Sequence, residues 1–293
     1  MQVGEDLLIH LTHGVVPHWS SGRISHALFL PEWLFALHLQ QRRTKYVSLT
    51  QALAGEGDAL TIDDATCGGL QAALLALRYG HAVSWFVNGI HVERGLPYFP
   101  FQISCMLDDT RQNDCLFEGR KWELRGNADR RALRQCLKHR YMRMRSEEEI
   151  AQLLEMVSYS LGVDSTSMES SLRTVTSEDL VAAVAAGVDL QNHSWRHLNP
   201  LLLSDSERTA EAVLNEDYLS QFRETTTHAY APPFGKQVSL NASVSDFVLL
   251  ADRGLMSGRR EGNIVNRHDL LPSEFAAVIA QMEHARGYVV GVP

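Results

Sequence analysis

Short apolar segments alternate with stretches of helical period along most of the chain. Segment 59–63 is a brief apolar run that stops at a polar pair, which is typical of a buried strand, and 188–192 is predicted as a further strand directly after a helix that Gly187 ends. The same pattern predicts further strands within 7–16, 81–87, 246–252 and 287–293. It predicts a helix at 30–43 with Pro31 in its first turn, and further helices from Gly68 to Gly80, from Thr176 to Gly187, and after Ser204.

Two of these helices carry explicit start signals. Thr176 with Asp179, and Ser204 with Glu207, have the spacing of a capping box. Repeated strand–helix–strand units favour a parallel sheet or barrel, and we see no repeat or linker that would divide the chain. In such folds functional groups collect where strands end, so the polar residues after 59–62 and 188–191 become the candidates for chemistry.

Composition narrows the class of protein. The chain has 293 residues, of which 45% are hydrophobic and 21% charged, so it is not disordered, collagen-like or a coiled coil. Its net charge of −8 argues against a general nucleic-acid binder. No apolar run has the length of a transmembrane segment, and the first residues lack the basic region of a secretory signal. The four cysteines have no metal-site spacing, so we expect reduced thiols and a cytoplasmic protein.

Residues 120–145 stand apart, with ten Lys or Arg and only two acidic residues. One interpretation is a solvated helix face that balances nearby acids. The other is a site for a phosphate-bearing substrate or an acidic partner. The sequence leaves both interpretations open.

Two polar pairs have the composition of a hydrolytic metal site. Asp63 and Asp64 end one predicted strand, and His193 and His197 follow another. Two imidazoles four residues apart and one carboxylate can form a three-ligand set with an open position for water, as Zn²⁺ prefers. The second carboxylate can then take a proton from that water. Taken singly, the Asp pair also suits a loop or helix cap, and the His pair an exposed helix face.

Four ordered segments resemble a known family. The segment T-I-D-D-A (61–65) resembles the T-F-D-D-G motif of NodB-homology polysaccharide deacetylases, carbohydrate esterase family 4. H-S-W-R-H (193–197) is similar to the H-[ST]-x-x-H motif, and H-A-Y-A-P-P-F-G-K (228–236) to a variant of the third motif. L-T-H-G-V (11–15) resembles the start of a circularly permuted branch. The resemblance runs from about residue 7 to about residue 272.

This resemblance implies a fold and an activity. The fold would be α/β, a distorted (β/α)7 barrel of the NodB-homology deacetylase type, with 1–293 as one domain and a basic helical insertion around 110–150. The activity would be metal-dependent hydrolysis of N-acetyl groups on an amino sugar of a surface polysaccharide, such as O-antigen or capsule, or of its lipid- or nucleotide-linked precursor. The alternatives are a sugar O-deacetylase on the same scaffold and a non-catalytic glycan-binding barrel. The implied partner is a carbohydrate, with a phosphate-linked form included, and not nucleic acid.

Matched positions imply individual roles. Asp63 would be the general base, and Asp64, His193 and His197 would hold one divalent ion, for which Zn²⁺ is expected and Fe²⁺ and Co²⁺ are alternatives. His13 would be the acid that protonates the departing amine. From the third motif, the implied substrate-binding residues are Tyr230, Ala231, Pro232 and Phe234.

Some positions depart from the family pattern. Ala65 replaces a glycine, which would matter if that backbone needs positive φ. Ala231 stands where the other variant of the third motif has the arginine that orients the base. The sequence does not choose a substitute among Arg259, Arg260 and Arg267. His268 also rivals His13 for the role of the acid.

Overall fold

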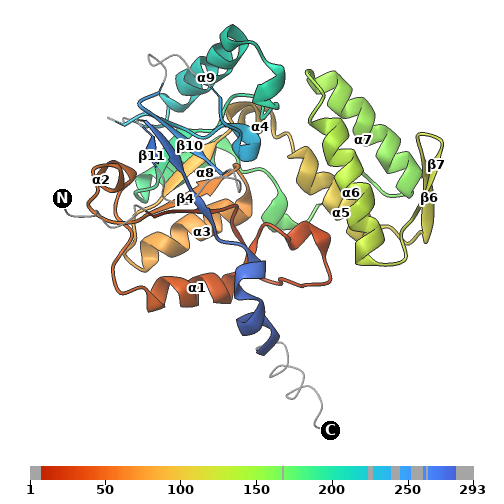
Figure 1. The fold of residues 1–293 in the computed structure, drawn as a ribbon, viewed down its shortest axis with the longest axis horizontal. Helices are drawn as coiled ribbons and strands as arrows, with labels where there is room; N and C mark the ends of the chain where they lie inside the picture. The colour runs from red at the N-terminus through yellow and green to blue at the C-terminus, as the bar shows by residue number, and fades with distance from the viewer. Residues whose placement is uncertain are drawn as a thin grey trace.

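A barrel of parallel strands occupies the centre of the molecule, with helices around it and a separate lobe to one side (Figure 1). The computed structural model describes residues 8–166, 168–223, 227–238, 245–251, 260–261 and 263–281. The strand predicted at 287–293 lies outside the described residues. No helix in these described ranges combines the length and the apolar character that crossing a bilayer requires.

The barrel closes through one broken strand. In order around the ring its members are β1 (Ile9–Thr12), β4 (Ala59–Asp63), β5 (Ser84–Val87), β8 (Asp189–Asn192), β9 (Ala229–Tyr230), β10 (Phe247–Leu250), β12 (Ile264–Asn266) and β13 (His268–Asp269). β12 pairs with β10 and β13 pairs with β1, both in parallel. Because only Arg267 separates β12 from β13, this segment completes a ring of parallel strands, and the expected (β/α)7 class is confirmed.

Strand register brings the predicted site residues to one end of the barrel. β4 lies between β1 and β5, and all five of its residues are buried, as its continuous apolar run predicts. Asp63 is its last residue. β8 lies on the other side of β5, with Asn192 opposite Val87, so His193 follows at the same end. Three further short strands lie near the barrel: β2 (Val15–Val16) pairs with β3 (Leu30–Pro31), and β11 (Arg260–Glu261) runs antiparallel to β12.

Helices cover the outside of the barrel. They are α1 (Glu32–Gln41), α2 (Leu49–Leu53), α3 (Cys67–Arg78), α4 (Gly89–Arg94), α8 (Ser177–Ala185) and α9 (Asp205–Leu219). The capping boxes expected before α8 and α9 are both present. α3 begins before the predicted Gly68, because the side chain of Thr66 caps it by accepting a hydrogen bond from the N–H of Gly69. Short 3-10 turns complete the set: η1 (Ile24–His26), η2 (Ser170–Leu172), η3 (Pro200–Leu202), η4 (Pro233–Gly235) and η5 (Pro272–Phe275).

The loop that follows β1 packs directly against the start of α3. Gly14 has φ +132°, and a Cβ there would lie 2.4 Å from the carbonyl carbon of Gly68. No other residue allows this approach of two backbones. The contact fixes the position of the neighbouring His13 relative to β4.

The lobe is built from one continuous segment of the chain and has its own apolar core. It contains α5 (Phe99–Asp109), a hairpin of β6 (Asp114–Phe117) and β7 (Arg120–Glu123), α6 (Asn127–Tyr141) and α7 (Glu147–Leu161). A separate hydrophobic cluster, which includes Leu107, Leu137 and Leu153, holds these elements together. The basic insertion expected around 110–150 falls inside this lobe, although residues 114–123 form a hairpin and not a helix.

Candidate active site

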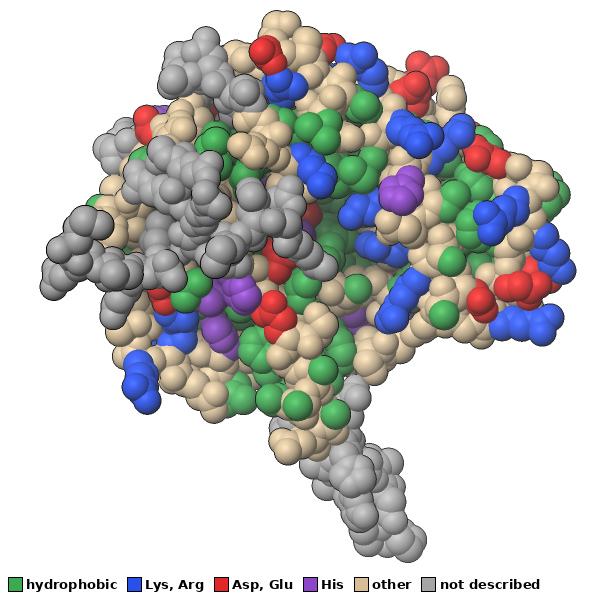
Figure 2. Space-filling view, in the orientation of Figure 1, with side chains coloured by type: hydrophobic (Ala, Val, Ile, Leu, Met, Phe, Trp, Pro, Cys, Tyr) green, Lys and Arg blue, Asp and Glu red, His purple; other side chains and the backbone are tan. Residues whose placement is uncertain are grey.

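The carboxyl ends of several barrel strands open into one cavity of about 400 Å³. It lies between the barrel and the lobe, where Figure 2 shows a hollow. Side chains that follow or end the strands line it, as is usual for functional groups in α/β barrels: His13, Asp63, Asp64, His193, His197 and Phe234. The lobe adds Phe101, Arg134 and Lys138.

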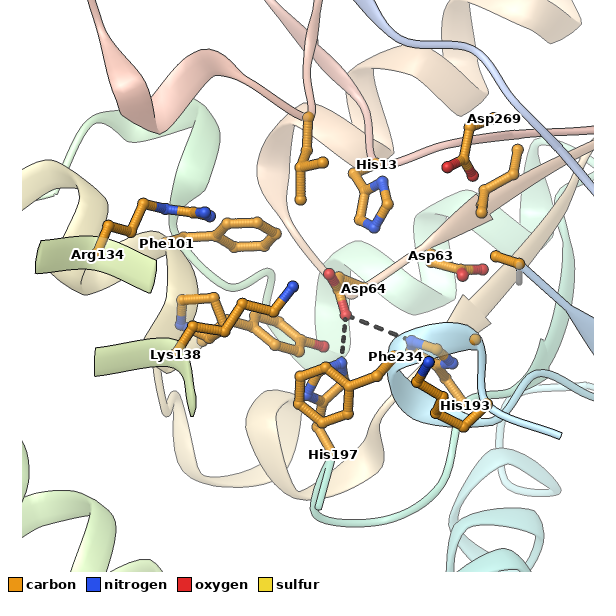
Figure 3. Close-up of a pocket in the computed structure, with 17 residues that line it drawn as sticks. His13, Asp63, Asp64, Phe101, Arg134, Lys138, His193, His197, Phe234 and Asp269 are labelled. Carbon is orange, nitrogen blue, oxygen red and sulfur yellow. Dashed lines mark ion pairs between the residues drawn. The ribbon is translucent and has the colours of Figure 1, made fainter. Parts of the chain in front are cut away.

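Three of these side chains converge on one point (Figure 3). Oδ1 of Asp64 lies 3.5 Å from Nε2 of His193 and 3.4 Å from Nε2 of His197, and all three residues are buried. These separations exceed those of ordinary hydrogen bonds. Two ligand atoms that are each about 2.1 Å from a tetrahedral Zn²⁺ ion lie about 3.4 Å apart. The two separations match this spacing, and all three candidate ligand atoms lie within 4.8 Å of one another.

The chemistry of these atoms also fits a cation. Oδ1 of Asp64 is buried and accepts no hydrogen bond from any described residue. Burial opposes ionisation of this carboxyl, but the facing imidazoles of His197 and His193 lower its pKa below the ordinary value. Burial lowers the pKa of His197 to about 3, so this ring is neutral and offers a lone pair. A buried carboxylate oxygen without a hydrogen-bond donor is costly unless a cation binds it.

Hydrogen bonds on the far side of each ring orient the two imidazoles. Nδ1 of His193 is 2.7 Å from the carbonyl oxygen of Ala231, so Nδ1 carries a proton, and in the neutral ring Nε2 faces Asp64 with its lone pair. Nδ1 of His197 lies 3.2 Å from the hydroxyl of Tyr141, which donates to the backbone carbonyl of His197 at 3.0 Å. Such outer contacts are typical of histidines that bind metals.

Unusual backbone geometry holds the ligands in place. Asp64 and His197 have φ of +66° and +53°, a region that non-glycine residues enter only at a cost. The carbonyl oxygen of Asp64 accepts a hydrogen bond from Nε1 of Trp85 at 2.8 Å, and the N–H of Ala65 donates to the hydroxyl of Tyr98 at 2.8 Å. Ala65 itself does not have positive φ, so its methyl group is tolerated where the family pattern has glycine.

Asp63 forms a bidentate ion pair with Arg267. Both carboxylate oxygens accept from the guanidinium at 2.7 Å, and the Arg267 side chain is fully buried. Burial opposes ionisation of Asp63, but this guanidinium lowers its pKa below the ordinary value. Of the three arginines that the sequence left open, Arg267 is the one in contact with Asp63. Arg259 and the side chain of Arg260 lie outside the described residues.

The two candidate acids occupy different surroundings. His13 lines the cavity, and its ring meets the ring of Phe101 edge-on with centroids 6.5 Å apart. The ring of His268 is 38% exposed and lies 3.3 Å from a carboxylate oxygen of Glu274. It does not line the cavity, whereas the adjacent Asp269 does. Placement therefore favours His13 over His268 as the acid.

Of the four substrate-binding residues predicted from the third motif, only Phe234 lines the cavity, and the other three are buried elsewhere. Phe234 lines the cavity and packs against His197 with ring centroids 5.0 Å apart. Tyr230 is 1% exposed and belongs to a hydrophobic cluster with Val248, away from the cavity lining. Ala231 and Pro232 are buried without lining the cavity, and Ala231 acts through the carbonyl oxygen that orients His193.

Comparison with known proteins assigns the family. The family model of the polysaccharide deacetylases matches residues 58–246, which is more than half of the chain. The protein belongs to the polysaccharide deacetylase family. As a polysaccharide deacetylase it is a hydrolase that acts on carbon–nitrogen bonds. No curated protein sequence matches the chain significantly. The matched residues include Asp63, Asp64, His193 and His197 but not His13.

Solved structures show that this deacetylase shares its fold with distant proteins. One is the Streptococcus pyogenes deacetylase PplD in complex with acetate, with a TM-score of 0.58 and 15% identity over 92% of this chain and 94% of that chain. Another is IcaB from Ammonifex degensii, with a TM-score of 0.53 and 15% identity over 94% and 97%. Both likenesses cover more than nine-tenths of each chain.

Several residues at the deacetylase site were not predicted from the sequence. Tyr141 orients His197 and Phe101 packs on His13, but an aromatic residue in a helix is ordinarily part of a core. Arg134 and Lys138 had a usable signal, since they are four residues apart in the basic stretch and project from one face of α6. The sequence could not indicate that this face meets the barrel.

Proposed function

We propose that the protein is a metal-dependent de-N-acetylase of an amino sugar in a surface polysaccharide or its precursor. The observation that carries the proposal is the convergence of Asp64, His193 and His197, whose ligand atoms lie within 4.8 Å of one another, with Asp63 beside them in a cavity large enough for a sugar. The alternatives are an O-deacetylase, which the same groups would also serve, and a non-catalytic glycan-binding barrel.

Asp64, His193 and His197 would hold one divalent ion through Oδ1 and the two Nε2 atoms. When bound, such an ion polarises the acetyl carbonyl and makes a water molecule more acidic. Nitrogen and oxygen ligands suit Zn²⁺, our first choice, and also Fe²⁺ and Co²⁺.

The remaining side chains divide the proton transfers. Asp63 accepts a proton from the attacking water, and the bidentate Arg267 keeps this carboxylate ionised and oriented. Water adds to the acetyl carbon, the bond from carbon to nitrogen breaks, and His13 gives a proton to the departing nitrogen. The products are acetate and a free amine. Phe101 and Phe234 present aromatic surfaces on which a sugar ring can pack.

The precursor form and the location remain part of the proposal. A lipid- or nucleotide-linked sugar would be modified in the cytoplasm before its export. The four free cysteines, of which Cys105 and Cys115 are buried, suit a reducing compartment. Fractionation of the native host with an antibody against the protein tests this point, and recovery only outside the cytoplasm would reject it.

Acetate release from N-acetylated amino sugars by the metal-loaded enzyme tests the activity. Asp63→Asn should lower kcat by about 10²- to 10⁴-fold, because a general base is lost, while the bound metal remains at one ion per chain. Asp114→Asn, at an exposed position in the lobe, is the matched control and should leave the rate unchanged. Full activity in Asp63→Asn, or no acetate from any sugar by the metal-loaded wild type, would reject the proposal.

The leaving group distinguishes amide from ester hydrolysis. An amine must be protonated as it departs, whereas an alcohol needs less help. His13→Ala should therefore reduce cleavage of an N-acetyl sugar far more than cleavage of the matched O-acetyl sugar. Equal small losses on both substrates would favour the O-deacetylase.

A further inference from the structure

Three cationic side chains line the cavity beside the proposed metal site. Arg134 and Lys138 enter from α6, four residues apart, and Lys236 follows η4. Figure 3 shows Arg134 and Lys138 extending from the lobe toward Asp64 and Phe101. Figure 2 shows Lys and Arg side chains along the lobe side of the hollow. We call Arg134, Lys138 and Lys236 the cationic wall.

The cationic wall differs from the rest of the basic stretch. Exposed members of that stretch form ion pairs away from the cavity, such as Arg140 with Glu118 at 2.7 Å and Arg145 with Glu207 at 2.8 Å. Arg134 is half-buried, and its Nε donates to the hydroxyl of Ser104 at 2.6 Å. No described acidic residue lies within ion-pair distance of Arg134. Its guanidinium is thus held in place by a neutral partner and faces the cavity.

The acidic side chains described on the cavity lining are not paired with Arg134. Asp63 already has its own buried guanidinium in Arg267. Asp64 would be matched by the divalent ion that the proposed function requires. Asp269 is the third acidic side chain on the lining. An uncharged acetylated sugar could only accept hydrogen bonds from the half-buried guanidinium of Arg134, whereas an anionic group would also balance its charge.

We propose that the cationic wall is an anion subsite for a phosphate group on the sugar substrate. The shared chemistry is a phosphate ester or diphosphate on the acetylated sugar, whether it is linked to a nucleoside or to a lipid. Arg134 supplies a planar fork that matches phosphate oxygens, and the two lysines add charge that adapts to position. This inference rests on the proposed function, since it needs the metal and the sugar in the same cavity.

Distances within the cavity allow one sugar to reach both sites. Nζ of Lys138 lies 5.9 Å from the ring centroid of Phe234, whose centroid is 5.0 Å from that of His197. The ammonium is therefore within about 11 Å of a proposed metal ligand. This is the reach of one sugar ring with its acetamido group on one side and a phosphate on the other, and Phe234 lies between them as a packing surface.

Equilibrium binding to the metal-loaded protein tests the subsite apart from catalysis. The probes are an N-acetylamino sugar 1-phosphate, its nucleoside-diphosphate and short-chain lipid-diphosphate derivatives, the uncharged methyl glycoside, and a matched uronic acid. We expect the phosphorylated sugars to bind at least about tenfold more tightly than the methyl glycoside at low salt. Lys138→Gln and Arg134→Gln should each remove most of that difference, and Lys138→Arg should keep it.

Arg131→Gln is the matched control, because Arg131 is exposed on the same helix and does not line the cavity. It should change no affinity by more than about twofold. Preference for one diphosphate derivative identifies the source of the phosphate. Equal binding of charged and uncharged sugars, preference for the uronic acid, or a preference that survives Lys138→Gln would each overturn the inference. Phosphate-selective binding without acetate release would support the subsite and reject the proposed activity.

Discussion

Two groups of histidines lie on opposite sides of strand β1, and only one has the geometry of a metal site. On the cavity side, Nε2 of His193 and of His197 face one carboxylate oxygen. On the opposite side, His10 packs among His38, Tyr46 and His268, with ring centroids 5.5–6.0 Å from its own. The alternation of a strand separates the groups, since Leu11 lines the cavity while His10 points away from it.

The difference between the groups lies in what surrounds the rings. In the cavity, a carbonyl or hydroxyl group fixes one nitrogen of each ring, and a buried carboxylate oxygen faces the other. Neither ring nitrogen of His10 has a hydrogen-bond partner among the described residues, and burial lowers its pKa to about 3. In the described parts of the chain, only Asp64, His193 and His197 bring three ligand atoms within 4.8 Å. The candidate metal site is therefore distinguished by imidazole nitrogens that converge on one carboxylate oxygen, and not by the number of histidines.

The largest expected effect is on metal content. His193→Ala removes a ligand, so we expect bound metal to fall from one ion per chain to none, and acetate release to fall at least about 10³-fold. His10→Phe, in the other group, should leave both quantities unchanged. Metal analysis after gel filtration and an acetate assay measure them. An ion retained by His193→Ala and lost by His10→Phe would reverse the comparison.

The second largest effect concerns the buried ion pair between Asp63 and Arg267 at the cavity. Arg267→Met leaves the buried carboxylate of Asp63 without its partner, which should cost about 3–5 kcal/mol in the free energy of unfolding. The loss of the guanidinium should also raise the pKa of Asp63. Denaturant titration measures the first change and the acid limb of kcat/KM measures the second.

A double variant separates charge from packing at this pair. Arg267→Met with Asp63→Asn removes both charges, so it should recover much of the stability that Arg267→Met loses. A single-variant cost below about 1 kcal/mol, or a double variant no more stable than Arg267→Met, would show that the pair is not a strongly coupled buried charge pair.

Local pattern was sufficient to predict the elements that carry most of the site. β4 occupies 59–63 as predicted, because it is an enclosed strand with an apolar run and a clear boundary. β8 begins one residue inside its predicted range, shortly after the helix that precedes Gly187. Asp63 and Asp64 follow from the end of β4, and His193 from the end of β8. The chemistry of these residues could therefore be inferred before their positions were known.

Long-range contacts could not be predicted in this way. Arg267 is separated from Asp63 by most of the barrel, and only the break between β12 and β13 brings its guanidinium inside. Tyr141 reaches His197 because the lobe folds back on the barrel, which no local period encodes. Tyr230 has the residue type of the third motif, but the direction of its side chain from β9 places it in the core.

The smallest effect is the pH dependence of stability from the histidine group outside the cavity. Burial, aided by the charge of Arg42 and by His38 and His268, lowers the pKa of His10 from 6.5 to about 3 in the folded protein. Below about pH 6.5 the unfolded chain binds a proton that the folded chain does not. Stability is therefore present above that pH and is lost as the pH falls toward 3, with a slope of at most about 1.4 kcal/mol per pH unit.

Replacement of the His10 ring should remove its contribution to the pH dependence of stability. His10→Phe keeps the apolar contacts of a ring in this pocket and also eliminates two unsatisfied nitrogens, so it should be at least as stable as the wild type at pH 5. His139→Phe, at an exposed position on α6, is the matched control and should keep the full slope. Urea titrations between pH 4.5 and about 7.5 compare the three proteins. If His10→Phe loses stability in parallel with the wild type as the pH falls, the ring of His10 binds its proton as readily in the folded protein as in the unfolded chain, and burial does not lower its pKa.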